Sequence, residues 1–185
     1  MSSRFEPFLG LSVELTAFSY FDLLGTGLAE RYLATLDTVV GSEITDALLA
    51  AFTALPPSES EARIHAVRTT ILGNELLGDV ARALIKLWYS GTWFELSSAW
   101  TERFGPRPAN TTFVVSPDAY IEGLLWKAIG AHPPGAKGQG FGSWAFPPKI
   151  PAPAPVPKPD LTPLPLVFKE LDQRHDELSA STDAR

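Results

Sequence analysis

The chain is 185 residues long, with 45% apolar residues, 19% charged residues and a net charge of −6. This acidic balance argues against a nucleic-acid-binding protein, which needs a basic surface for the phosphates. The absence of cysteine excludes disulfides, thiol catalysis, attachment of c-type haem and iron–sulfur clusters held by cysteine.

The sequence carries no membrane or export signal that we can identify. No apolar run reaches the roughly 20 residues that a membrane-spanning helix needs, so we expect no transmembrane segment. Residues 1–7 lack the charged start, apolar core and cleavage site of a signal peptide. As printed, the sequence therefore predicts a cytoplasmic location.

The first predicted helix covers residues 9–24. Apolar residues recur there at spacings of three and four, and others widen the stripe until the segment is apolar nearly all round. A helix on the protein surface would have a polar face. We therefore expect this helix to be central in the fold or to face a partner protein.

Three further helices are predicted from apolar periodicity in the middle of the chain. The first covers residues 44–55 and ends at Pro56-Pro57. Ser58-Glu59-Ser60-Glu61 matches a capping box, which opens the next helix through Ile71. The segment 77–88 forms another helix, for which Gly91 is a natural left-handed cap.

The rest of the body combines one helix with irregular segments. Residues 111–115 are β-prone but isolated, so we interpret them as an extended linker. Ser116-Pro117-Asp118 is a good start for a helix over 120–129, and a Gly/Pro-rich stretch with aromatic residues follows. The prediction is an all-α fold, a compact bundle of five to six helices within residues 1–146.

A long extended Pro-rich C-terminal arm is predicted over residues 147–166. Nearly every second residue there is proline, which fixes φ and removes a backbone donor, so neither a helix nor a central strand can form. At ~3.1 Å per residue the arm could reach about 60 Å. Residues 167–185 follow as a short helix and a frayed tail. An arm this long on a small body indicates a chain that binds a larger partner protein.

Motifs that carry chemistry are weak in this sequence. His65, His132 and His175 lie far apart, and a metal site needs converging ligands. Residues 130–137 superficially resemble a phosphate loop, but no strand precedes them and Gly138 replaces the magnesium-binding Ser or Thr. We predict no catalytic, cofactor-binding or metal-binding residue in this chain.

Aromatic and proline side chains are the better candidates for function, as contacts with a partner protein. For Trp88 and Trp126, which lie on apolar stripes, a place in the core is the alternative interpretation. The predicted partner-binding residues are Trp88, Tyr89, Trp126, Phe141, Trp144, Phe146, Pro147, Pro148, Pro151, Pro153, Pro155 and Pro157.

Several segments together resemble a known family over roughly residues 8–148. They are the opening 8–18 (Phe-Leu-Gly-Leu-Ser-Val-Glu-Leu-Thr-Ala-Phe), the stretch 28–33, the motif Trp88-Tyr89-Ser90-Gly91 at a helix end, and 118–128 with the Gly-rich run to Trp144. These segments are similar to the small subunit of bacterial FAD-dependent sugar and polyol dehydrogenases, the family of the sorbitol, fructose, glucose and gluconate dehydrogenase complexes.

The resemblance implies a non-catalytic subunit without a cofactor of its own. Such a subunit binds a large flavoprotein of the glucose–methanol–choline oxidoreductase type, which carries the FAD, and supports its folding. The resemblance also implies a separate cytochrome subunit as a further partner. Family members are commonly periplasmic and are exported through a twin-arginine signal, which the printed residues do not contain.

One alternative of a different class stays open. Pro148-Lys149-Ile150-Pro151 gives a P-x-x-P match, which is typical of ligands for small domains with an aromatic-lined groove. On that interpretation the chain is an adaptor whose Pro-rich segment is bound by another protein.

Overall fold

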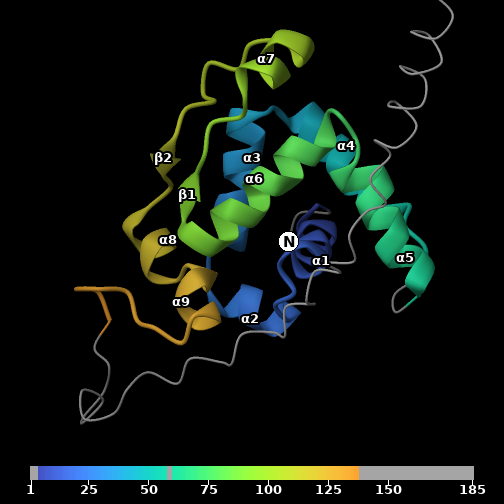
Figure 1. The fold of residues 1–185 in the computed structure, drawn as a ribbon. Helices are drawn as coiled ribbons and strands as arrows, with labels where there is room; N and C mark the ends of the chain where they lie inside the picture. Colours follow the sequence, from blue (N-terminus) through green and yellow to red (C-terminus); the bar gives the residue numbers. More distant parts are fainter. Residues whose placement is uncertain (1–3, 58–59, 138–185) are drawn as a thin grey trace, which may run out of the picture. The chain divides into compact units, whose positions relative to one another are not determined.

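The structure is a computed structural model that describes residues 4–57 and 60–137 (Figure 1). The predicted all-α class is confirmed, and the described residues contain more helices than the five to six predicted. The elements are α1 (Phe5–Thr16), α2 (Tyr20–Gly25), α3 (Ala29–Val39), α4 (Ser42–Thr53), α5 (Glu61–Ala66), the π-helix η1 (Val67–Leu72), α6 (Leu77–Ser90), β1 (Thr92–Trp93), α7 (Ser98–Phe104), β2 (Phe113–Val114), α8 (Pro117–Ile121) and α9 (Leu124–Ala128). Segment 138–146, the predicted arm and the predicted C-terminal helix lie outside the described residues. None of the described helices has the length and apolar character needed to cross a membrane.

Helix α1 lies at the centre of the helical body. It contacts α2, α3, α4 and α6 (Figure 1), and its residues Phe8, Leu9 and Leu11 have no exposed surface. The one fully buried polar side chain of α1, Ser12, is hydrogen-bonded, since its hydroxyl donates to the Phe8 carbonyl at 2.8 Å. The all-round apolar character of this part of the sequence therefore reflects a helix surrounded by other helices.

The predicted single helix over 9–24 is wrong, because the chain breaks after α1. Ala17 adopts a left-handed backbone conformation with φ 60° and ends α1. Ser19 then caps α2: its hydroxyl accepts from the Asp22 backbone N–H at 3.1 Å and donates to the Asp22 carboxylate at 2.6 Å. As a result α1 is buried, whereas α2 lies at the surface.

Two other predicted helices differ in detail from the structure. Ser60 caps α5, by accepting from the Arg63 backbone N–H at 3.1 Å, so the predicted start at Ser58 is wrong. The buried Arg63 guanidinium binds Glu14 of α1 and the Pro56 carbonyl, which holds α5 against α1. The predicted helix over 120–129 is two short helices, α8 and α9, because the chain turns at Gly123.

Residues 113–114 form a strand, so interpreting 111–115 wholly as a linker is wrong. β2 pairs antiparallel with β1, with Trp93 opposite Phe113. The buried Asn110 side chain supports this pair, since its Oδ1 accepts from the Leu96 backbone N–H at 2.9 Å and from the Trp93 indole at 3.3 Å. The partner strand comes directly after α6, about twenty residues earlier in the chain, so the pairing is not visible locally.

Candidate partner-binding surface

The motif Trp88-Tyr89-Ser90-Gly91 lies at the C-terminal end of α6, where it connects the core to α8. Trp88 is only 1% exposed, and its indole N–H donates to the Ser12 hydroxyl of α1 at 2.9 Å. Its ring stacks on Phe8 at 6.3 Å and meets the edge of Tyr32 at 4.8 Å. The prediction that Trp88 contacts a partner is therefore wrong, because its surface is used within the core.

Tyr89 joins the end of α6 to the turn between α1 and α2. Its hydroxyl donates to the Thr16 carbonyl at 3.0 Å, and its ring meets the edge of Phe18 at 5.9 Å. The side chain is half-buried by these contacts. Tyr89 thus fixes the position from which the chain continues, through the turn, into α2.

Gly91 allows α8 to lie directly on the end of α6. Its φ of 68° ends α6 as a left-handed cap, as predicted from the sequence, and its carbonyl accepts from the Val115 N–H at 3.0 Å. A Cβ at this position would lie 2.3 Å from the Ala119 carbonyl carbon and oxygen. Only glycine fits both the conformation and this close contact.

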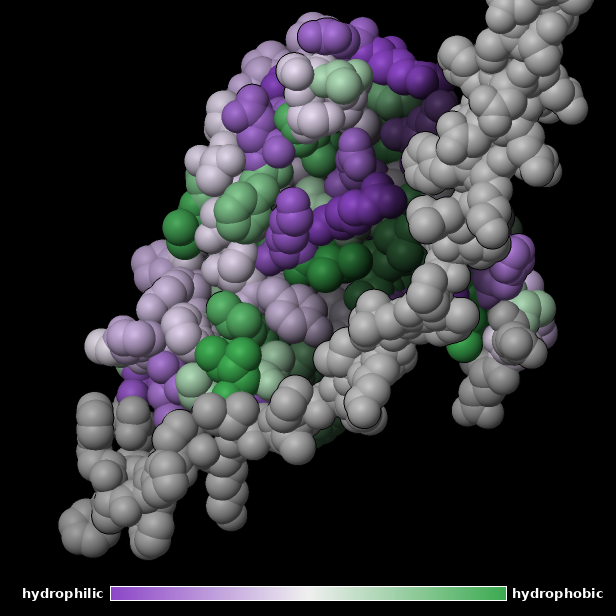
Figure 2. Space-filling model, in the orientation of Figure 1, coloured by the Kyte–Doolittle hydropathy of each residue, from purple (hydrophilic) through white to green (hydrophobic). Residues whose placement is uncertain are grey.

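The two elements positioned in this way, α2 and α8–α9, expose large apolar side chains next to one another. Phe21 of α2 is 83% exposed, which is the largest value for a large apolar side chain among the described residues. We call the following set the α2–α9 surface: Tyr20, Phe21, Leu24, Tyr120, Leu125 and Ile129. Figure 2 shows hydrophobic residues in green over the position of α9, in the lower part of the coloured surface. Single exposed apolar residues are ordinary, whereas large contiguous apolar patches are typical of interaction sites.

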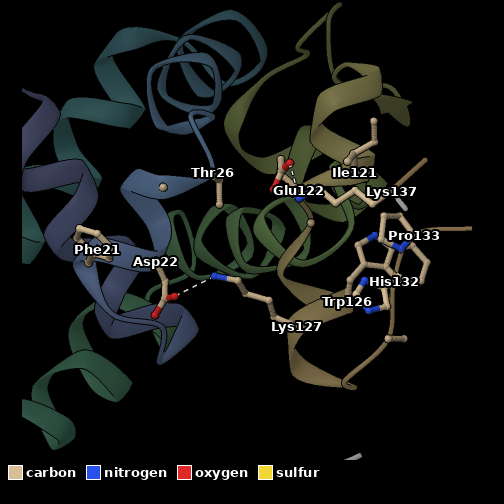
Figure 3. Close-up of a pocket in the computed structure, with 13 residues that line it drawn as sticks. Phe21, Asp22, Thr26, Ile121, Glu122, Trp126, Lys127, His132, Pro133 and Lys137 are labelled. Atoms are coloured by element: carbon tan, nitrogen blue, oxygen red, sulfur yellow. Dashed lines mark hydrogen bonds and ion pairs between the residues drawn. The ribbon is translucent and has the colours of Figure 1, made fainter. Parts of the chain in front are cut away.

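A pocket of about 360 Å³ borders this surface at Phe21, between α2 and the α8–α9 segment with the loop that follows it (Figure 3). Two ion pairs cross or border the pocket: Lys127 to Asp22 at 2.9 Å, and Lys137 to Glu122 at 2.7 Å. Each lysine is thus neutralised by a carboxylate, and the lysines give the pocket no net positive charge. The residues that line the pocket are Phe21, Asp22, Gly25, Thr26, Ile121, Glu122, Gly123, Trp126, Lys127, Ala131, His132, Pro133 and Lys137.

The titratable groups of α2 are held in one protonation state near neutral pH. The Ser19 hydroxyl, and then Lys127, hold the pKa of Asp22 below its ordinary value by hydrogen bonds to the ionised carboxylate. Desolvation, and then the nearby Glu6, raise the pKa of Tyr20 above its ordinary value. A carboxylate that stays charged and a phenol that stays neutral suit a binding surface better than acid–base chemistry at neutral pH.

Trp126 is the predicted partner-binding residue that the structure places at this surface. Its indole N–H donates to the Tyr120 carbonyl at 2.7 Å, and its ring meets the edge of Tyr120 at 5.4 Å. The ring is partly exposed and lines the pocket. The other predicted contacts, Phe141, Trp144, Phe146, Pro147, Pro148, Pro151, Pro153, Pro155 and Pro157, lie outside the described residues and stay predictions.

The sequence did not identify Phe21, Leu125 and Ile129 as site residues. The only signal for Phe21 was the all-round apolar character of 9–24, which indicated a central helix or a partner-facing one. The interpretation as a central helix holds for α1, whereas α2 is exposed and its contact with a partner stays a prediction. Leu125 and Ile129 carried no signal beyond ordinary helix periodicity.

Within residues 4–57 and 60–137, no three His, Asp or Glu side chains come together in a group that could hold a metal ion. His65 and His132 are both exposed, and His132 borders the pocket. Comparison of the chain with models of protein families, with curated proteins and with solved structures finds no match.

Proposed function

We propose that this chain is a non-catalytic small subunit, which binds and stabilises a large FAD-dependent oxidoreductase of the glucose–methanol–choline type that acts on sugars, polyols or glycosides. The FAD belongs to the large subunit. A cytochrome subunit is a further component of the proposed complex.

The observation that carries the proposal is the exposed apolar α2–α9 surface, with Phe21 at its most accessible point. Two neighbouring elements expose this set, and α9 is joined to α2 through the Lys127–Asp22 ion pair. A stable interface buries about 800 Å² on each partner, with apolar and aromatic residues at its centre. The α2–α9 surface supplies such a centre, with charged residues at its border.

The proposal gives a structural role to the motif residues Trp88, Tyr89 and Gly91. Trp88 and Tyr89 connect α6 to α1 and to the turn before α2, while Gly91 receives α8. They hold the two elements of the α2–α9 surface in a fixed relation, which lowers the entropy that binding would otherwise cost.

The test is co-expression with a large flavoprotein of the glucose–methanol–choline type from the same genome. We expect size-exclusion chromatography with light scattering to show a yellow complex heavier than either chain, and the flavoprotein to be insoluble when it is expressed alone. A colourless monomer that does not bind the flavoprotein would contradict the proposal and favour the adaptor function.

Substitutions on the surface make the test specific. Phe21→Ser combined with Leu125→Ser removes two exposed apolar side chains, and we expect at least a tenfold lower yield of the complex. Ile64→Ser is the matched control, because Ile64 of α5 is 57% exposed and lies outside the α2–α9 surface. An equal loss of complex for both variants would show that nonspecific apolar contacts, and not the α2–α9 surface, bind the partner.

A further inference from the structure

The pocket of the α2–α9 surface lies where the described part of the chain ends. Lys137, the last described residue, lines the pocket and donates to Glu122 across it at 2.7 Å. The sequence continues as Gly138-Gln139-Gly140-Phe141-Gly142-Ser143-Trp144-Ala145-Phe146, which places three aromatic residues among three glycines. Aromatic residues thus occur in the sequence within a few positions of Lys137, which lines the pocket.

The size and lining of the pocket fit aromatic side chains. Its volume of about 360 Å³ is at the low end of the roughly 300–1,000 Å³ of small-molecule sites, so it suits one or two side chains. The rings of Phe21 and Trp126 and the ring of Pro133 offer apolar contacts to an inserted ring. The ammonium groups of Lys127 and Lys137 border the same space, where they can lie over an aromatic face.

The connection between the pocket and the aromatic residues is short. Three residues separate Lys137 from Phe141, and the four Cα–Cα steps between them span at most about 14 Å when fully extended. A short connection gives an effective concentration in the millimolar range, so even a weak contact is populated. An external ligand of the same chemistry would have to compete with that concentration.

We infer that this pocket is a docking site for the aromatic segment 138–146 of the same chain, with Phe141 or Trp144 as the inserted ring. The inference concerns the isolated chain and does not depend on the proposed function. If a partner protein binds the α2–α9 surface, it competes with the chain's own segment for one site. Association then includes displacement of that segment.

The absence of cysteine allows a direct test in the full chain, since an introduced pair contains the only thiols. Gly25→Cys is suited to the pocket, because Gly25 lines it and an added Cβ meets nothing within 4 Å. Ser143→Cys lies between the two candidate rings and leaves both intact. A disulfide forms only when the two Cα atoms come within about 7 Å.

The matched control pairs Ser143→Cys with Ala128→Cys, an exposed position on α9 that is outside the pocket lining. In a glutathione redox buffer, we expect the intramolecular disulfide of the Gly25/Ser143 pair to form at least tenfold faster than that of the control pair. Adding Phe141→Ser and Trp144→Ser should reduce the rate to the control value.

Three results would overturn the inference. Equal rates for the two pairs would mean that the segment has no preference for the pocket. A fast rate that survives loss of both rings would remove the aromatic contact from the explanation. A disulfide between two chains, seen as a dimer on a non-reducing gel, would assign the pocket to a second copy. None of these measurements requires the flavoprotein.

Discussion

Replacing Gly91 by alanine tests how the end of α6 supports α8. The first cost is conformational, because Gly91 has φ 68° and alanine in that left-handed region costs about 1–2 kcal/mol. The second cost is steric, because the new Cβ would lie 2.3 Å from the backbone of Ala119, a fully buried residue. Relief requires movement of α8, and overpacking of this kind costs about 1–3 kcal/mol.

Gly27 provides a matched control for this substitution. It has the same φ of 68°, but an added Cβ at this position meets nothing within 4 Å. Gly27→Ala should therefore show the conformational cost alone, and the entropy that alanine removes from the unfolded chain is the same in both variants. The difference between the two variants measures the steric cost, about 1–3 kcal/mol.

The assay is urea unfolding followed by far-UV circular dichroism, with the yield of the flavoprotein complex as a second measurement. We expect Gly91→Ala to lose about 2–5 kcal/mol of unfolding free energy and Gly27→Ala about 1–2 kcal/mol. Gly91→Ala should also lower the yield of complex, since α8 carries part of the α2–α9 surface. Equal destabilisation by the two substitutions would refute the close contact between Gly91 and Ala119.

Four further predictions concern buried and charged groups. The Tyr32 hydroxyl is buried, and within the described residues it has no hydrogen-bond partner, so Tyr32→Phe should raise the unfolding free energy by about 1 kcal/mol. Tyr89→Phe removes the bond to the Thr16 carbonyl and should lower it by about 0.5–1.5 kcal/mol, so the same change has opposite signs at two positions. Hydrogen bonds from Arg4 lower the pKa of the Asp37 carboxylate in the folded state. As the pH falls below ~4, this carboxylate is protonated in the unfolded chain before it is protonated in the folded chain, so the unfolding free energy decreases. Urea midpoints measured across pH 2–7 should therefore fall less with pH for Asp37→Asn than for the unchanged chain. Lys127→Ala breaks an exposed ion pair and should change the unfolding free energy by less than about 1 kcal/mol, and a larger loss in the same assay would contradict the small contribution expected of an exposed pair.

Local signals in the sequence predicted those helix ends that depend on a single residue. Gly91 ends α6, Pro117 starts α8 and the Pro56-Pro57 pair follows α4, each for a reason that the residue itself supplies. The break after α1 was missed because the left-handed residue is Ala17, not glycine. The Ser19 cap was present in the sequence but was obscured by apolar periodicity on both sides.

The candidate site depended on contacts that a linear reading does not contain. The apolar stripe of α6 was compatible with Trp88 either in the core or at a partner interface. The hydrogen bond to Ser12 shows that it lies in the core. The exposure of Phe21 follows from the turn at Ala17, which directs α2 away from the direction of α1. Strand β2 was missed because its partner β1 lies on the other side of α7 in the sequence.

The central position of α1 has a consequence for synthesis on the ribosome. Helix α1 is made before the helices that cover it, and one of these, α6, follows much later: the Ser12–Trp88 hydrogen bond joins residues 76 positions apart. At a translation rate of about 5–20 residues per second, several seconds pass between the synthesis of α1 and that of α6. During that interval the nascent chain exposes the surface that becomes its core. Early chaperone contact should therefore concentrate on α1 and should end once α6 has left the exit tunnel.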